Sequence, residues 1–149
     1  MRQPIVSIFC IWTQRHALSE ILSAPSSVSL AFLVHGVRPE HPEAVLTPLV
    51  HALAARALDA EVEIHFAGPA VRYLCQNIAH NCWPHPGQEK SLAAWLDEAH
   101  AAGVHFFACS MAQAAWLGAN DSLRAEVKSA GATAFVARSL DPAWRTLVY

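Results

Sequence analysis

Residues 103–118 read GVHFFACSMAQAAWLG, and within this run a strand pattern changes to a helical pattern at Cys109. Residues 104–108 form a short apolar stretch of the kind that builds a strand buried on both faces of a sheet. Residues 111–117 have the pattern of a helix that begins just after the cysteine. A strand that leads directly into a helix favours a fold in which strands and helices alternate.

The alternation extends over most of the chain. Residues 28–36, VSLAFLVHG, are almost continuously apolar, and residues 60–67, AEVEIHFA, alternate between apolar and polar side chains. We expect two more strands over residues 132–137 and 144–148. With residues 104–108, these segments predict a sheet of about five strands.

Helical periodicity fills the segments between these strands. Residues 45–58 place their apolar side chains on one broad face, and residues 88–102 do the same before Gly103, a typical helix stop. Shorter helices are predicted over residues 70–80 and 121–130. The order of elements predicts an α/β fold whose mostly parallel sheet is covered by helices on both faces.

Composition excludes several classes of function. The chain has 149 residues, which suits one compact domain, and its 10 basic and 12 acidic residues are scattered, which argues against nucleic-acid binding. It contains neither a GxGxxG fingerprint nor a Walker-type phosphate loop, and Ser110 lacks the GxSxG context of a hydrolase nucleophile. A domain of this size does not need its four cysteines as disulfides, so we expect a reducing, cytoplasmic setting.

The first 27 residues differ from the rest of the chain. An apolar run at residues 5–12 faintly resembles a secretory signal, but Arg15 and Glu20 interrupt it. The run is also much shorter than the roughly 20 residues of a membrane span. We therefore interpret residues 1–27 as an N-terminal arm and residues 28–149 as the domain.

The position of Cys109 is favourable for chemistry. Reactive groups of parallel sheets gather at the carboxyl ends of the strands, and the first amides of a helix stabilise an anionic thiolate. His35, at the end of the first predicted strand, is a candidate for approaching Cys109 as a proton shuttle, although such a residue more often closes a turn. The alternative for Cys109 is a small buried hydrophobe at a strand end.

A second cluster of reactive side chains lies at residues 75–85. Cys75, His80, Cys82 and His85 are soft ligands that suit zinc or copper, but their spacing fits no standard zinc pattern. The alternative interpretation buries Cys75 on a short helix and exposes the histidines in a loop. A metal-binding or thiol-redox sensing module therefore stays open as a second reading of this chain.

Residues 91–121, SLAAWLDEAHAAGVHFFACSMAQAAWLGAND, contain a helix, a glycine stop, a short strand, then a cysteine and a later glycine. This order resembles the DsrE/DsrF/TusD superfamily of sulfur-relay proteins. The first predicted strand, VSLAFLVHG, and the segment GPAVRYL at residues 68–74 are also similar to that family. The resemblance covers residues 28–149 and implies a flavodoxin-like, three-layer α/β/α sandwich that forms a homo-oligomer.

The resemblance also implies a chemistry. Cys109 would accept sulfane sulfur as a persulfide, the backbone amides of Ser110 and Met111 would stabilise it, and a partner thiol would remove it. Cys75 or Cys82 would serve as a possible second thiol. No metal or organic cofactor is required, and the protein would act as a sulfur carrier rather than as a classical turnover enzyme.

The implied partners are sulfur-donor and sulfur-acceptor proteins, such as a TusA-like or a rhodanese-like carrier. We expect no nucleic-acid partner and no membrane span. Arg72 and Lys90 are the candidate cations that would attract an anionic sulfur donor. A third possibility is a structural subunit with inert cysteines, against which the retained Cys109 argues.

Overall fold

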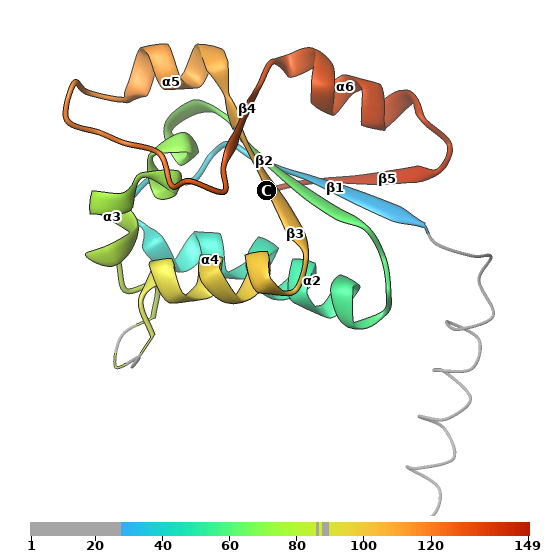
Figure 1. Ribbon diagram of the computed structural model, residues 1–149, viewed down its shortest axis with the longest axis horizontal. Coiled ribbons are helices and arrows are strands. Elements are labelled where there is room, and N and C mark those ends of the chain that lie inside the picture. The colour runs from blue at the N-terminus through green and yellow to red at the C-terminus, as the bar shows by residue number, and fades with distance from the viewer. Residues whose placement is uncertain (1–27, 86, 88–89) are drawn as a thin grey trace, which may run out of the picture.

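Five parallel strands form one sheet in the order β4-β3-β2-β1-β5 (Figure 1). The structure is a computed structural model that describes residues 28–85, 87 and 90–149. The N-terminal arm expected over residues 1–27 lies outside the described residues. The strands are β1 (Ser29–Val34), β2 (Val62–Phe66), β3 (Val104–Cys109), β4 (Lys128–Ala130) and β5 (Trp144–Val148).

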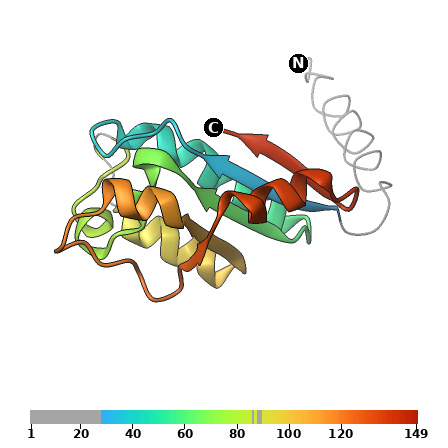
Figure 2. The ribbon, with the colours of Figure 1, turned by 90° about the horizontal axis from the view of Figure 1, so that it is seen from above.

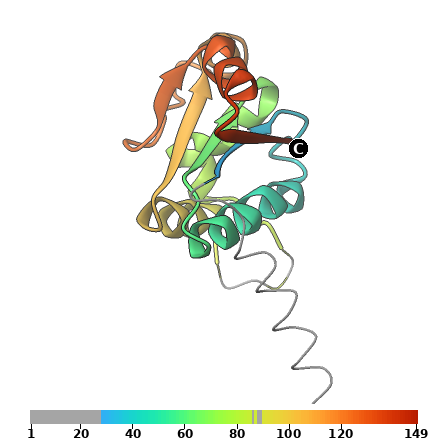
Figure 3. The ribbon, with the colours of Figure 1, turned by 90° about the vertical axis from the view of Figure 1, so that its right-hand side faces the viewer.

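Helices cover both faces of the sheet. The helices α2 (Leu46–Ala57) and α4 (Leu92–Ala101) lie on one face, and α5 (Ser110–Trp116) and α6 (Ala132–Leu140) lie on the other (Figures 1 and 3). The described residues also form η1 (Pro42–Val45), η2 (Gly68–Leu74) and α3 (Gln76–His80). The predicted three-layer α/β sandwich with a parallel sheet of five strands is confirmed. In flavodoxin the first strand lies between the second and third, whereas here β1 lies between β2 and β5, so the likeness is in the layers.

The core lies between the sheet and the α2–α4 layer. Side chains of alternate strand residues, such as Phe32, Ile64 and Phe106, are almost fully buried there, together with Leu49 of α2 and Leu96 of α4. The central strand, β2, is buried throughout, and β1 and β3, which have the most continuous apolar sequences, lie on either side of it.

The ends of α4 follow from local sequence. The Ser91 side chain accepts a hydrogen bond from the Ala94 amide at the first turn, which satisfies a donor that the helix itself leaves unpaired. Gly103 follows the last turn with a φ of 89°. Arg56 of α2 packs against this glycine and donates hydrogen bonds to the carbonyls of Ala102 and Ala60, so the glycine stop also locks α2 to α4.

The predicted helix over residues 121–130 is wrong. Leu123 forms an isolated bridge with Cys75, and residues 128–130 form β4 at the edge of the sheet. Asp121 accepts hydrogen bonds from the Gly118 amide and from the Asn77 side chain, so it closes a turn instead of capping a helix. Tertiary pairing with η2 and α3 therefore overrides a helical pattern in this segment.

The predicted strand over residues 132–137 is also wrong, because this segment begins α6. Phe135 and Arg138, three positions apart, both contact β2 side chains, as the period of a helix allows. In the view from above, α6 lies over the strands (Figure 2), and it contacts β5 and β1. The strand that we expected at 132–137 is replaced by β4, a few residues earlier.

The other predicted elements lie within a few residues of their expected positions. The helix expected over residues 70–80 is divided at Cys75 into η2 and α3. No helix in the described part of the chain is long and apolar enough to cross a membrane.

Candidate functional site

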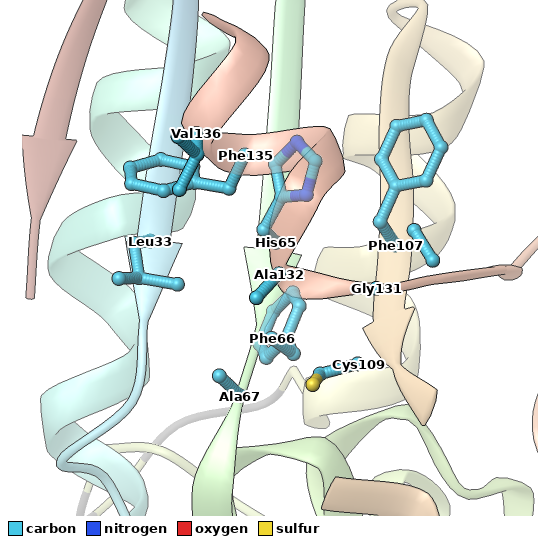
Figure 4. A pocket seen from close by; sticks show the side chains of 11 residues that line it. Leu33, His65, Phe66, Ala67, Phe107, Cys109, Gly131, Ala132, Phe135 and Val136 are labelled. Atoms are coloured by element: carbon cyan, nitrogen blue, oxygen red, sulfur yellow. The ribbon is translucent and has the colours of Figure 1, made fainter. Parts of the chain in front are cut away.

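A pocket of about 240 Å³ lies between α6 and the carboxyl-terminal halves of the strands (Figure 4). Its walls come from β1, β2, β3, the end of β4 and the first turns of α6. Figure 4 shows the Cys109 sulfur at the lower end of this group of residues and the His65 ring at the upper end. The pocket thus lies toward the carboxyl ends of the strands, where α/β proteins bind their ligands.

Cys109 is the last residue of β3 and also precedes the first residue of α5. Its thiol is free and partly buried, and it lines the pocket. Ser110 and Met111, whose amides begin α5, are exposed. The sequence therefore predicted correctly that a strand would pass into a helix at this cysteine.

Gln113 holds the strand-to-helix junction in place. Its side-chain amide donates hydrogen bonds to the Ala108 carbonyl at 3.0 Å and to the Ser129 hydroxyl at 2.9 Å. These contacts tie the first turn of α5 to both β3 and β4. Because Cys109 lies directly beside this anchor, its backbone position is set by contacts on both strands.

The N-terminus of a second helix lies at the same pocket. Ala130 is paired with Cys109 in the register of β3 and β4, and Gly131 and Ala132 at the start of α6 line the pocket. The unpaired amides at a helix N-terminus favour negative charge. A thiolate or persulfide anion on Cys109 would therefore lie close to the start of α5 and share a pocket with the start of α6.

His65 is the pocket residue that the sequence analysis missed. It lies on β2, is 6% exposed, and stacks on Phe107 with a centroid distance of 4.8 Å and an interplanar angle of 12°. Phe135 of α6 meets the same ring edge-on at 5.5 Å. The signal in the sequence was the period-two spacing of Glu63 and His65, two polar residues within a strand that is buried throughout.

A hydrogen-bonded chain connects His65 to α6. Its Nε2 lies 3.2 Å from Glu63 Oε2, and Arg138 donates two hydrogen bonds to the Glu63 carboxylate, at 2.9 and 2.7 Å. Such bidentate pairing is the strongest form of arginine–carboxylate contact. Glu63 is therefore satisfied on both sides although it is buried.

The environment changes the proton affinity of both groups. Burial lowers the pKa of His65, and the Glu63 hydrogen bond opposes this only in part. Burial alone would raise the pKa of Glu63, but the hydrogen bonds from Arg138 and His65 hold that pKa below its usual value. A carboxylate beside a neutral imidazole is thus the favoured pair at neutral pH.

His35 and the two cations suggested by the sequence do not belong to the described lining of the pocket. His35 is exposed, and its amide donates to the Tyr149 carbonyl. Arg72 pairs with Glu40, while Lys90 pairs with Glu98 and lies over the Trp95 ring. The histidine of the pocket is His65, from the neighbouring strand.

Cys75 and Cys82 are buried free thiols outside the described pocket lining. Burial raises the pKa of each to about 11, and for Cys75 the nearby Asp121 carboxylate adds to the increase. At neutral pH both side chains are therefore thiols, whereas thiol exchange requires a thiolate.

The structure does not bring the four candidate metal ligands together. Cys75, His80, Cys82 and His85 all belong to the described residues, and among those residues no three histidine, cysteine or acidic side chains are grouped to hold a metal ion. His80 is exposed at the end of α3, while Cys75 is fully buried before its start. The cluster in the sequence is therefore not a cluster of ligands in space.

A comparison with protein families places this geometry in a known group. The model of the DsrE/DsrF-like family matches residues 29–149, which include every strand of the sheet and the pocket with Cys109. A search of the curated proteins found no match. On the family match over most of its length, the chain belongs to the DsrE/DsrF-like family.

Proposed function

We propose that this protein is a sulfur carrier in which Cys109 accepts sulfane sulfur as a persulfide and passes it to a partner thiol. Membership of the DsrE/DsrF-like family implies a role in sulfur relay or sulfur transfer. The observation that carries the finer proposal is the position of Cys109, a partly exposed free thiol that opens into a pocket at the end of β3.

The chemistry requires only thiol exchange. The Cys109 thiolate attacks the outer sulfur of a donor persulfide, a new S–S bond forms, the donor S–S bond breaks, and the donor leaves as a thiolate that takes up a proton. An acceptor thiolate then attacks the same sulfur and releases Cys109. The negative charge of the persulfide would lie at the start of α5, where the amides of Ser110 and Met111 begin the helix and would stabilise it.

Intact-mass spectrometry tests this assignment. We expect the full chain, treated with inorganic polysulfide, to gain one sulfur atom that a reductant removes, and we expect Cys109→Ser to lose this gain. Cys75→Ala and Cys82→Ala serve as controls that retain it, because both thiols are buried with raised pKa values. An unchanged gain in Cys109→Ser would move the site to one of the other three cysteines, Cys10, Cys75 or Cys82, and no gain in the wild type would reject the carrier.

The partners proposed for this reaction are a donor and an acceptor protein, such as a TusA-like or rhodanese-like carrier, in a reducing cytoplasmic setting. We also propose a homo-oligomer. Its support is the exposure of large apolar side chains, with Met111 77% and Leu140 80% exposed. Light scattering of the purified chain tests the assembly, and a monomer at all concentrations would contradict it.

A further inference from the structure

The pocket is larger than the sulfur it is proposed to receive. A persulfide adds one sulfur atom to Cys109, whereas the pocket has a volume of about 240 Å³. An apolar protein cavity of about 150 Å³ is enough to bind benzene. The space beside Cys109 therefore accommodates a sulfur atom together with an organic group of about the size of a benzene ring.

The wall of this space is apolar and partly aromatic (Figure 4). The Phe107 ring is held by stacking on His65, and Phe135 closes against the same histidine from α6. Leu33 and Val136 add aliphatic surface to the lining. Because the rings are fixed by one another, the surface is already formed before a ligand arrives, which reduces the cost of binding.

The pocket offers no cation to an anionic ligand. Among the described residues that line it there is no aspartate, glutamate, lysine or arginine. His65 is directed to Glu63, and burial lowers its pKa, so the ring is neutral at neutral pH. Arg138, the cation of the same network, is engaged by both oxygens of Glu63. A carboxylate on the organic group, held away from Cys109 and the helix N-termini, would therefore lose its hydration without meeting a cation.

We propose that the pocket binds the uncharged, apolar organic group of a low-molecular-weight hydropersulfide, R–S–SH, and holds its outer sulfur at Cys109. The proposal rests on the carrier function for its transfer step. In that step the Cys109 thiolate forms a bond to the outer sulfur, the S–S bond of the donor breaks, and R–S⁻ leaves with the electron pair and takes a proton from solvent. One thiol is oxidised to the persulfide and one donor sulfur is reduced to a thiol, so no further oxidant or reductant enters.

Two donors that differ by one charge test the substrate class. Benzyl hydropersulfide and 4-carboxybenzyl hydropersulfide carry the same reactive group on the same ring, and the initial rate of sulfur gain at Cys109 is followed by intact mass. We expect the uncharged donor to react at least roughly tenfold faster, because the charged ring must be desolvated in an apolar pocket. Equal rates, or a faster carboxylated donor, would overturn the proposal.

A matched pair of variants on α6 tests whether this pocket makes the distinction. Ala132→Phe places a ring in the pocket, whereas Ala137→Phe places one on the same exposed helix at a position outside the described lining. We expect A132F to reduce the rate preference to near parity and A137F to keep it, with both variants retaining the circular dichroism of the wild type. If A132F keeps the rate preference for the uncharged donor, this pocket does not produce the selectivity, and the proposal is overturned.

Binding without transfer separates the two proposals. In Cys109→Ser, which has no thiol to modify at this position, the unreactive probe benzyl methyl sulfide should shift the NMR signals of Phe107 and Phe135, and A132F combined with C109S should abolish these shifts. Probe binding with no sulfur gain from either donor, or from inorganic polysulfide, would reject the carrier function but retain the apolar binding site. Sulfur gain from polysulfide but from neither benzyl donor would retain the carrier and reject the donor role of the pocket. Sulfur gain in the wild type with no probe binding in C109S would retain the carrier and reject the pocket as its donor site.

Discussion

Glu63 is the residue that connects the reactive face of the sheet to its covering helix. It is 4% exposed, and its carboxylate is shared by Arg138 of α6 and His65 of β2. Arg138 in turn lies over the Trp144 ring at 4.1 Å. Burial of the Glu63 carboxylate costs desolvation free energy, which the contacts with these partners offset. If a partner is removed, the desolvation cost remains and the fold is destabilised.

Arg138→Met is therefore expected to lower the free energy of unfolding by about 2 kcal/mol, because it leaves a buried carboxylate without its cation. The side chain is partly exposed, so solvent reduces the effect below that of a fully buried pair. Urea unfolding at neutral pH measures it. Arg145→Met is the control: Arg145 is exposed and, within the described part of the chain, donates hydrogen bonds to carbonyls alone, so its loss should stay within about 0.5 kcal/mol. Equal losses in the two variants would contradict this account.

The pKa values of His65 and Glu63 predict acid sensitivity. Both are lowered in the folded state, so the unfolded chain binds more protons as the pH falls, first below 6.5 for His65 and then below 4.5 for Glu63. The stabilisation from each group is thus fully present when the pH is above its unfolded-state pKa, and it is lost as the pH falls toward the lower folded-state pKa. His65→Phe keeps a ring beside Phe107, and its urea midpoint should change less than that of the wild type between pH 6.5 and 4.5. Parallel profiles would show that His65 does not titrate in this way.

At the scale of elements, α6 is the least buried of the long helices. None of its nine residues, all of which are described, is buried, whereas α2 and α4 each bury four. Phe135 and Arg138 connect α6 to the His65 and Glu63 side chains of β2. The free energy of local opening is lowest where few apolar side chains are buried. We therefore expect α6, the helix that closes the pocket, to open more easily than α2 or α4.

Hydrogen exchange measures this difference. We expect the amides of α6 to exchange at least about tenfold faster than those of α4 under native conditions. Glu63→Gln should accelerate exchange in α6 further, because the charged pairing with Arg138 is lost, and leave the protection of α4 relative to α2 unchanged. Uniform protection across the three helices would contradict the view of α6 as a separately opening element.

Gly103 tests the junction of α4 and β3. Its φ of 89° disfavours any residue with a Cβ, and a Cβ there would lie 2.9 Å from the Arg56 guanidinium. Gly103→Ala should therefore destabilise the fold by about 1.5 kcal/mol in urea unfolding. Gly36→Ala is a matched control, because among the described residues, its chain neighbours apart, no heavy atom lies within 4 Å of the added Cβ. It should change stability by less than about 0.5 kcal/mol. A similar loss of stability in the two variants would contradict the view that the positive φ and the Arg56 contact require glycine at position 103.

At the scale of the whole molecule, the central strands and the place of Cys109 were predictable because they depend on local patterns. Continuous apolar runs identified β1 and β3, and the change of pattern at residue 109 identified the start of α5. The segment from Asp121 to Arg138 was not predictable in this way. Its structure depends on pairing with distant residues, such as Leu123 with Cys75 and Arg138 with Glu63, and a single sequence does not show such pairs.

The pocket was unpredictable for the same reason. Its lining is drawn from residues that are far apart in the chain. In the sequence His65 is one of nine histidines, and only the fold places Phe107 and Phe135 around it. The cluster at residues 75–85 shows the converse, since Cys75 and His80 are close in sequence but one is buried and the other exposed, as the alternative to a metal site predicts.

The connection through α6 joins β4 at one edge of the sheet to β5 at the other, and the pocket lies beneath it. An occupant of that pocket would touch β1, β2, β3 and the connection at once, so complete unfolding must release it. A ligand that binds only the folded protein stabilises it by mass action. A compound present at a hundred times its dissociation constant raises the free energy of unfolding by about 2.7 kcal/mol, and the melting temperature with it. The melting temperature of the protein is therefore a direct means of screening small molecules, including those that never exchange an atom with Cys109.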